Sequence, residues 1–189
     1  MKTKSKIFQP FKVKDIVFLA IISAVTLCTC AVMPLVASLQ TVVFGIAQVV
    51  TSLQISVFFS IGLMKVRKTG SLFIMALLTG VFQLLMAPPM FFSNIINGII
   101  IEILVYVIFK GYEKNRAVFF AVLLYNPLSL PFNFIYNLLF GREAMVTVAT
   151  KAPWVTVGMT LAVVALSALG AFIGIKISKE LKKSGVIKK

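Results

Sequence analysis

The 189-residue chain contains no histidine and only five acidic residues, against nineteen lysines and arginines. Without histidine, it lacks the commonest metal-binding side chain and the general base of Ser-His catalytic triads. Only one acid, Glu102, falls inside a long apolar run, so paired carboxylate chemistry has no second partner there. We therefore expect a protein that is not an enzyme and that uses no metal or other cofactor.

Cysteine is almost as scarce. Cys28 and Cys30 stand two residues apart inside an apolar run that is expected to be helical, so their side chains point to different faces and cannot easily form a disulfide. We interpret both as small packing residues rather than as a redox pair or a metal site.

Charged residues of either sign are few. They make up 13% of the chain, whereas hydrophobic residues make up 60% and the mean hydropathy is +1.04. Soluble domains carry roughly 25% charged and about 45–50% apolar residues. This balance argues against a soluble enzyme, a nucleic-acid-binding module and a disordered tail. The net charge of +14 sits in short basic patches between apolar runs, which is typical of contact with anionic lipid headgroups rather than with nucleic acid.

What the sequence does contain is a series of long apolar segments. A membrane-spanning helix needs about 20 residues, so the chain has room for six crossings with short connections. We predict an all-α integral membrane protein, a compact six-helix bundle that forms one transmembrane domain over residues 1–189. The second helix is expected to be either continuous or broken near Gly45 or Thr51. The predicted helices are Ile16–Val36, Leu39–Met64, Ser71–Met86, Met90–Phe109, Ala117–Phe140 and Trp154–Ile175.

The distribution of basic residues predicts the orientation. If both termini are cytoplasmic, seventeen lysines and arginines lie inside and only Arg142 and Lys151 lie outside, as the positive-inside rule requires. This asymmetry fails for an odd number of crossings. We therefore expect a multi-pass protein of the plasma membrane, with a basic cytoplasmic N-terminus (residues 1–14) and a basic cytoplasmic tail (residues 176–189).

Uncharged polar residues gather in the outer half of the predicted bundle. Amide and hydroxyl groups there offer both donors and acceptors to a ligand, so they are candidate substrate-binding residues. Taken singly, each is better explained as a hydrogen-bonding tie between helices, and Trp154 as an interface anchor. The one-sided clustering of the set is what favours an outward-facing pocket. Met90, Phe91, Phe92 and Tyr136 are expected to supply apolar walls, and Gln40 and Gln48 open the second helix nearby. The candidates are Gln83, Ser93, Asn94, Asn97, Asn133, Tyr136, Asn137 and Trp154.

Two further features have alternative interpretations. Glu102 is either a polar tie to a neighbouring helix or a contact for a ligand or ion. Ala20 and Ala24 have the small-xxx-small spacing that lets another helix approach closely, whether inside the bundle or from a partner.

Several of these residues together resemble a known class of membrane protein. A basic start leads into Lys14-Asp15-Ile16 and Ala20-Ile-Ile-Ser-Ala24, and a basic turn, Lys65-Val-Arg-Lys-Thr-Gly70, follows the second helix. With six compact helices, this pattern resembles the S components of energy-coupling factor (ECF) transporters, and within them the Trep_Strep, or MptD-type, group. The resemblance covers nearly the whole chain, although its motifs are loose.

The resemblance implies a substrate-binding subunit that captures a vitamin or related micronutrient at the outer face. Such subunits dock on a transmembrane T component driven by two ABC ATPases, and they topple in the membrane to release substrate inside. The family's AxxxA docking motif corresponds to Ala20 and Ala24, and its pocket lies at the outer ends of helices 4–6. The connection between helices 1 and 2 looks short beside the long lid of several relatives, so residues 141–153 are expected to close the pocket instead.

The pocket lacks a charged pair, apart from Arg142, Glu143 and Lys151 at its rim, which favours a neutral or weakly charged, partly aromatic substrate. The chain also has no GxxxxGK[ST] sequence for binding ATP phosphates, so transport energy is expected to come from a partner. The alternative function is a self-sufficient, proton-coupled secondary transporter that uses Glu102. The two halves show no internal repeat, which weakens that alternative.

Overall fold

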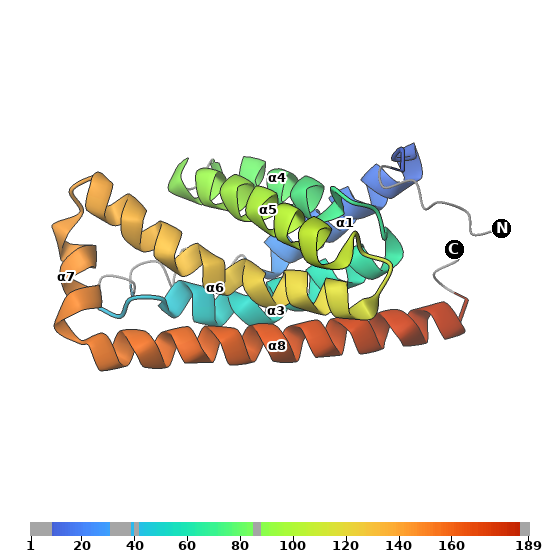
Figure 1. The fold of residues 1–189 in the computed structure, drawn as a ribbon. Helices are drawn as coiled ribbons and strands as arrows, with labels where there is room; N and C mark the ends of the chain where they lie inside the picture. Colours follow the sequence, from blue (N-terminus) through green and yellow to red (C-terminus); the bar gives the residue numbers. More distant parts are fainter. Residues whose placement is uncertain (1–8, 31–38, 40–41, 85–87, 186–189) are drawn as a thin grey trace.

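The computed structural model describes residues 9–30, 39, 42–84 and 88–185, which contain seven α-helices and no strands (Figure 1). The helices are α1 (Val13–Thr29), α3 (Ile46–Lys65), α4 (Ser71–Leu84), α5 (Pro88–Phe109), α6 (Asn115–Leu139), α7 (Glu143–Lys151) and α8 (Pro153–Lys183). All but α7 correspond to helices predicted from the apolar segments.

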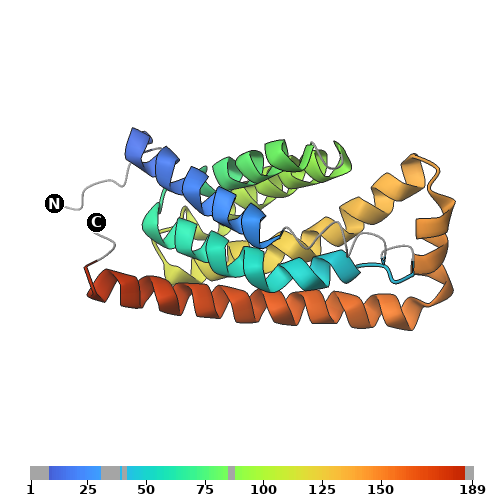
Figure 2. The ribbon, with the colours of Figure 1, turned by 180° about the vertical axis from the view of Figure 1, so that it is seen from behind.

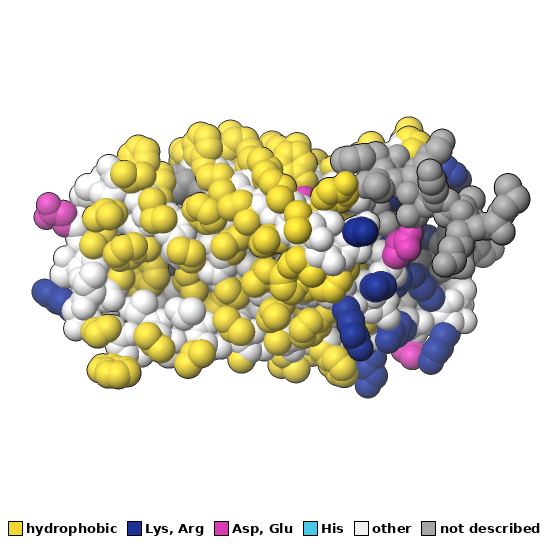
Figure 3. All heavy atoms as spheres, viewed as in Figure 1, with side chains coloured by type: hydrophobic (Ala, Val, Ile, Leu, Met, Phe, Trp, Pro, Cys, Tyr) yellow, Lys and Arg dark blue, Asp and Glu magenta, His cyan; other side chains and the backbone are white. Residues whose placement is uncertain are grey.

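Four helices are long and apolar enough to cross a membrane: α3, α6 and α8 over their full length, and α5 from Met90 to Phe109. The apolar side chains on their outer surfaces form a broad hydrophobic band (Figure 3). α1, with 17 residues, and α4, with 14, are shorter than the roughly 20 residues that a crossing needs. The predicted ends of these two helices, up to residues 36 and 86, lie outside the described residues. Six crossings therefore remain a prediction.

Helix boundaries depart from the prediction at two places. α3 begins at Ile46 rather than at Leu39, because Gly45 has the left-handed φ of +86° and ends any preceding helix. One of the two predicted break points is thus where the helix begins. α8 continues eight residues beyond Ile175, so the first part of the predicted tail is helical. Lys182 and Lys183 lie in its last turn, where they interact favourably with the helix dipole.

α3 and α8 form the most extensive helix pair, and small residues line the contact between them. A Cβ added at Gly170 would lie 2.6 Å from the Leu53 carbonyl oxygen, and one added at Gly174 would lie 2.5 Å from that of Val57. Ser56 and Ser60 of α3 face the same two glycines. The two backbones can approach this closely only because the glycines lack side chains. We call this contact the α3–α8 seam.

The start of α1, the α3–α4 and α5–α6 turns and the end of α8 all lie at one end of the bundle (Figures 1 and 2). Lys and Arg side chains gather at this end (Figure 3), which we call the basic end. Asp15 ties α1 to it: the Asp15 Oδ2 accepts a 3.1 Å hydrogen bond from the Lys12 backbone N–H and pairs with Lys68 Nζ at 2.6 Å. The positions of these helix ends agree with an even number of crossings.

The hydrophobic core has two parts. The larger cluster, which includes Phe59, Leu72, Ile101 and Tyr125, packs toward the basic end. A smaller cluster of Phe44, Leu130, Ala149 and Val163 joins α6, α7 and α8 at the opposite end. Tyr125 of the larger cluster also lines the cavity described next.

Candidate functional site

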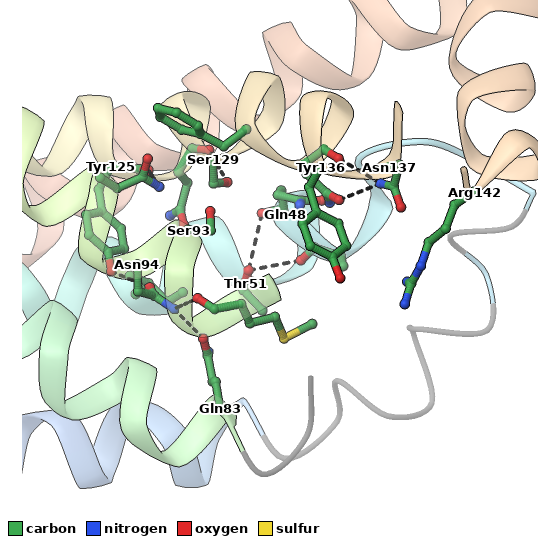
Figure 4. Close-up of a pocket in the computed structure, with 17 residues that line it drawn as sticks. Gln48, Thr51, Gln83, Ser93, Asn94, Tyr125, Ser129, Tyr136, Asn137 and Arg142 are labelled. Atoms are coloured by element: carbon green, nitrogen blue, oxygen red, sulfur yellow. Dashed lines mark hydrogen bonds between the residues drawn. The ribbon is translucent and has the colours of Figure 1, made fainter. Parts of the chain in front are cut away.

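A cavity of about 160 Å³ opens among α3, α4, α5 and α6, at the end away from the basic residues (Figure 4). An apolar cavity of similar volume, about 150 Å³, holds benzene. Most of the residues that line this cavity have uncharged polar side chains. The lining residues are Ala47, Gln48, Thr51, Ile55, Gln83, Met90, Ser93, Asn94, Asn97, Tyr125, Asn126, Ser129, Phe132, Asn133, Tyr136, Asn137 and Arg142.

Asn94 organises the wall formed by α4 and α5. Its Nδ2 donates to Gln83 Oε1 at 2.5 Å and to the Met90 carbonyl at 2.6 Å, while its Oδ1 accepts from the Tyr125 hydroxyl. The three hydrogen bonds are all consistent with this orientation of the Asn94 amide group, in which Nδ2 is the donor and Oδ1 the acceptor. Asn94 therefore links three helices and leaves little of its own hydrogen-bonding capacity free for a ligand.

Asn97 and Gln48 differ from Asn94 because each has a buried oxygen without a partner. Asn97 is 1% exposed, and its Nδ2 donates to the Tyr125 carbonyl at 3.4 Å, yet its Oδ1 has no hydrogen-bond partner among the described residues. The same holds for Gln48 Oε1. A buried carbonyl oxygen without a hydrogen bond costs free energy, about 1–3 kcal/mol. Both residues line the cavity, but the two oxygens themselves are buried against the protein.

α6 supplies the opposite wall in spite of two internal prolines, Pro127 and Pro131. Side chains bind backbone carbonyls around the first proline: Ser129 Oγ donates to the Asn126 carbonyl at 2.6 Å, and Asn97 binds that of Tyr125. Such bonds help a membrane helix to tolerate proline. Farther along α6, Asn137 Nδ2 donates to both the carbonyl and the Oδ1 of Asn133, each at 2.8 Å.

Arg142 is the one charged residue among the described residues that line the cavity. Its guanidinium lies over the Tyr136 ring, 5.6 Å from the centroid, and that ring stacks on Phe140 at 4.4 Å. In Figure 4 the Arg142 side chain extends alongside Tyr136. The aromatic contact holds a positive charge at this edge of the cavity.

The structure brings seven of the eight predicted substrate-binding residues together. Gln83, Ser93, Asn94, Asn97, Asn133, Tyr136 and Asn137 all line the cavity. The eighth, Trp154, does not: it is 86% exposed near the start of α8 and does not contribute to the wall. Its exposure is what its alternative role, an anchor at the membrane interface, requires.

Other predicted parts of the pocket lie outside its wall. Phe91 and Phe92 contact one another, with ring centroids 5.5 Å apart, and neither lines the cavity. Most of residues 141–153 forms α7, and Val148 and Ala149 pack on the smaller core cluster. That this segment closes the pocket stays a prediction. Of the three predicted rim charges, only Arg142 lines the cavity. Gln40 lies outside the described residues.

Sequence reasoning missed Asn126, Ser129 and Tyr125 as lining residues. They lie about one to two turns before Asn133 on α6, and Asn126, Ser129 and Asn133 share the spacing of one helix face. Extending the polar face of Asn133 back along the helix at intervals of three and four residues would have found them.

Glu102 and the α1 alanines lie away from the cavity wall. Glu102 Oε1 accepts hydrogen bonds from the backbone N–H groups of Leu72 at 2.9 Å and Phe73 at 3.3 Å, so its carboxyl group caps α4 from α5. On α1, Ala20 is partly buried and Ala24 is exposed. Leu19, Ser23 and Thr26 form the buried side of that helix.

A comparison with protein families bears on the whole bundle. A family model described as a hypothetical bacterial integral membrane protein (Trep_Strep) matches residues 13–183, from the first residue of α1 to the last residue of α8. The chain belongs to the Trep_Strep family. No curated protein and no solved structure matches it. This Trep_Strep chain is therefore a multi-pass integral membrane protein whose family has no established function.

Proposed function

We propose that this chain is the substrate-binding S component of an ECF importer in the plasma membrane. In this role it captures a vitamin or related micronutrient at the outer face and delivers it inward with a T component and two ABC ATPases. The observation that supports the proposal best is the cavity itself. A pocket lined mainly by residues with uncharged polar side chains lies inside helices that expose many large apolar side chains.

The position of the cavity also supports binding from outside. It lies at the end of the bundle opposite the basic end, and the positive-inside rule assigns the basic end to the cytoplasm. Both ends of such a chain are then cytoplasmic. The lining residues offer hydrogen bonds and one positive charge, without a carboxylate that could act as a general acid or base. A binding role therefore suits this wall better than catalysis does.

The exposed face of α1 is the proposed docking surface for the T component. Ala24 and its apolar neighbours Val17, Ile21 and Val25 are exposed along this face, and Ala20 borders it. Small side chains there would let a partner helix approach closely. Since α1 packs only one side on α3 and α4, the other side is available (Figure 2).

Two measurements test the proposal. The first is mass spectrometry of small molecules that remain bound to the protein after gentle purification from its native membrane, where one recurring micronutrient-like compound is expected. The second is assembly with coexpressed T component and ATPases, together with uptake. Ala20→Trp and Ala24→Trp should abolish both assembly and uptake while the purified protein still binds its substrate. Ala165→Trp, at an exposed position of α8, is the matched control and should assemble normally.

Unchanged assembly and uptake in both α1 variants would refute the docking surface. The proton-coupled alternative is less favoured, because Glu102 caps α4 and does not line the cavity. It predicts that protein alone in liposomes takes up substrate when a pH gradient is applied, and that Glu102→Gln stops this uptake.

A further inference from the structure

A groove on the outer surface of the bundle lies between the start of α4 and the second half of α5. Its volume is about 350 Å³, and it shares no lining residue with the cavity described above. Ile99, Ile103 and Tyr106 of α5 line it, and each of these side chains is at least 40% exposed. Thr69 and Phe73 line its other side. We call it the α4–α5 groove.

The groove forms because α5 extends beyond the start of α4. Two backbone N–H groups in the first turn of α4 bond to Glu102 Oε1, at 2.9 and 3.3 Å, so the start of α4 lies level with Glu102. From there α5 continues to Phe109, about two turns farther. Ile103 and Tyr106 lie on this extension, where α4 no longer runs beside α5.

The surface that the groove exposes is apolar. Glu102 also lines the groove, but the residue is only 9% exposed, its Oε1 is bonded to α4, and its Oε2 is buried against the protein. α5 is one of the four candidate membrane spans, so the groove opens toward hydrocarbon. An occupant that reaches this surface must therefore be apolar along most of its length.

Lys110 lies at the mouth of the groove, at the basic end. Ile103, Tyr106 and Lys110 follow one another at intervals of three and four residues, which keeps them on one face of α5. The Lys110 backbone N–H donates to the Tyr106 carbonyl at 3.0 Å, so the helical register extends to it. The next residue, Gly111, lies against the α4 side of the mouth, since an added Cβ would be 3.6 Å from Thr69 Oγ1.

The positive charge at this mouth has no counter-ion among the described residues. Their two ion pairs are Lys68–Asp15 and Lys183–Glu180. Lys68, which precedes Thr69, is thus neutralised, whereas the exposed Lys110 is not. Lysines at a membrane surface attract the phosphates of anionic lipids. A lipid headgroup at the mouth would supply the missing negative charge.

The length of the groove matches the depth of one leaflet. Ile99 and Lys110 lie on the same helix, and eleven residues at 1.5 Å each separate them by about 16 Å along its axis. Half of the hydrocarbon core of a bilayer is about 15 Å thick. A phospholipid whose phosphate meets Lys110 would therefore lay an acyl chain along the whole groove.

From these observations we propose that the α4–α5 groove binds one anionic phospholipid of the leaflet that surrounds the basic end. The phosphate binds Lys110, and an acyl chain packs on Phe73, Ile99, Ile103 and Tyr106. In Figure 3, hydrophobic side chains cover the face on which α5 lies, and basic side chains gather beyond them at the basic end.

The groove is separate from the docking surface proposed on α1. Both α1 and α5 pack on α4, and α5 lies in front in Figure 1 whereas α1 lies in front in Figure 2, which shows the molecule from behind. The lipid site therefore goes beyond the proposed function and does not depend on it.

The test uses the full chain, purified in detergent and titrated with phosphatidylglycerol or with phosphatidylcholine of identical acyl chains. Native mass spectrometry counts the bound lipids and gives a dissociation constant for each. Lys110→Gln removes the charge at the mouth, and Ile103→Trp fills the groove. Lys179→Gln and Ile177→Trp make the same substitutions at exposed positions near the end of α8, which packs on α3 and α6, and are the matched controls. Circular dichroism establishes that each variant is folded.

We expect the wild-type protein to bind one phosphatidylglycerol molecule about five-fold more tightly than phosphatidylcholine, the effect of one lysine at an anionic membrane surface. Lys110→Gln should remove this preference. Ile103→Trp should weaken the binding of both lipids, because the bulkier side chain occupies the place of the acyl chain. Both control variants should bind as the wild-type protein does.

Equal affinity of the wild-type protein for the two lipids would overturn this inference, as would an unchanged preference in Lys110→Gln. Unchanged lipid binding in Ile103→Trp would show that the lipid lies elsewhere. If Ile103→Trp binds lipid normally but no longer assembles with the T component and ATPases, the groove receives a protein helix and the lipid site is wrong. None of these results concerns the cavity, so the proposed function would stand in each case.

Discussion

Alanine at Gly174 should destabilise the protein, although alanine is normally the better residue in a helix. The new Cβ would lie 2.5 Å from the Val57 carbonyl oxygen and 2.7 Å from Ser60 Cβ. Favourable carbon–oxygen contacts are about 3.3 Å or longer, so α3 and α8 would have to separate locally by roughly 0.8 Å. A gap of about 0.5–1 Å already loses a quarter to a half of each dispersion contact around it.

The two opposing effects can be compared. Forcing an extra carbon into a well-packed contact costs about 1–3 kcal/mol, whereas replacing glycine with alanine in a helix gains up to about 1 kcal/mol. We therefore expect Gly174→Ala to lower the free energy of unfolding by about 1–2 kcal/mol. Gly158→Ala is the matched control in the same helix, because nothing lies within 4 Å of its added Cβ. It should leave the stability unchanged or slightly raised.

The assay is unfolding by sodium dodecyl sulfate in mixed micelles, followed by far-ultraviolet circular dichroism. Both substitutions change helix propensity by the same amount. The difference between the two variants in free energy of unfolding therefore reports the packing of the α3–α8 seam alone. If Gly174→Ala and Gly158→Ala shift the transition equally, the close approach of α3 and α8 described here is wrong.

Three further predictions concern polar groups. Glu102→Leu leaves the two capped N–H groups of α4 without their acceptor and should lower the free energy of unfolding by about 1–3 kcal/mol in the same assay. Glu102→Gln should lower it less, because an amide oxygen remains. If Glu102→Leu is as stable as the wild-type protein, the cap is contradicted. At the basic end, outside the four candidate spans, the hydrogen bond from Lys68 lowers the pKa of Asp15. The Asp15–Lys68 ion pair therefore contributes its stabilisation, about 0.2–1 kcal/mol, in full above the ordinary aspartate pKa of about 4. This contribution is lost as the pH falls through the lower pKa of the folded protein. Asp15→Asn should remove this acid dependence of the unfolding midpoint. In a cysteine-free background, Lys151→Cys should react with a membrane-impermeant maleimide in intact cells and Lys179→Cys only after permeabilisation; the reverse pattern would invert the proposed orientation.

Much of the bundle could be predicted from hydropathy because a bilayer leaves few alternatives to apolar helices. Each of the six predicted helices begins or ends within about three residues of an observed boundary. The exceptions have local causes: Gly45 interrupts the second apolar segment through its backbone conformation, which hydropathy does not record. α7 is too short and too polar to register as an apolar segment, and it was expected to be a loop.

The candidate site shows the same division between pattern and geometry. The one-sided clustering of amides in the sequence predicts that Asn94, Asn97 and Asn133 lie near one another, and all three line the cavity. Spacing along the chain could not show that Asn94 is fully engaged while Asn97 keeps a free oxygen, because that depends on how Tyr125 meets α5. Nor could it show that Trp154 faces outward, since one step along a helix turns a side chain by about 100°.

The α3–α8 seam has a consequence for how this family can diversify. At Gly170 and Gly174 the α8 backbone packs directly on the α3 backbone. Because the glycines have no side chains, no change of rotamer can adjust the register of the two helices there. Gln48 and Thr51, by contrast, lie on the part of α3 that borders the cavity. If the cavity is the substrate site proposed above, relatives should therefore exchange residues at positions 48, 97 and 142 as their substrate changes, while the two glycines stay fixed. In an alignment of relatives grouped by substrate, the two glycine positions should be invariant. Positions 48, 97 and 142 should differ between the groups.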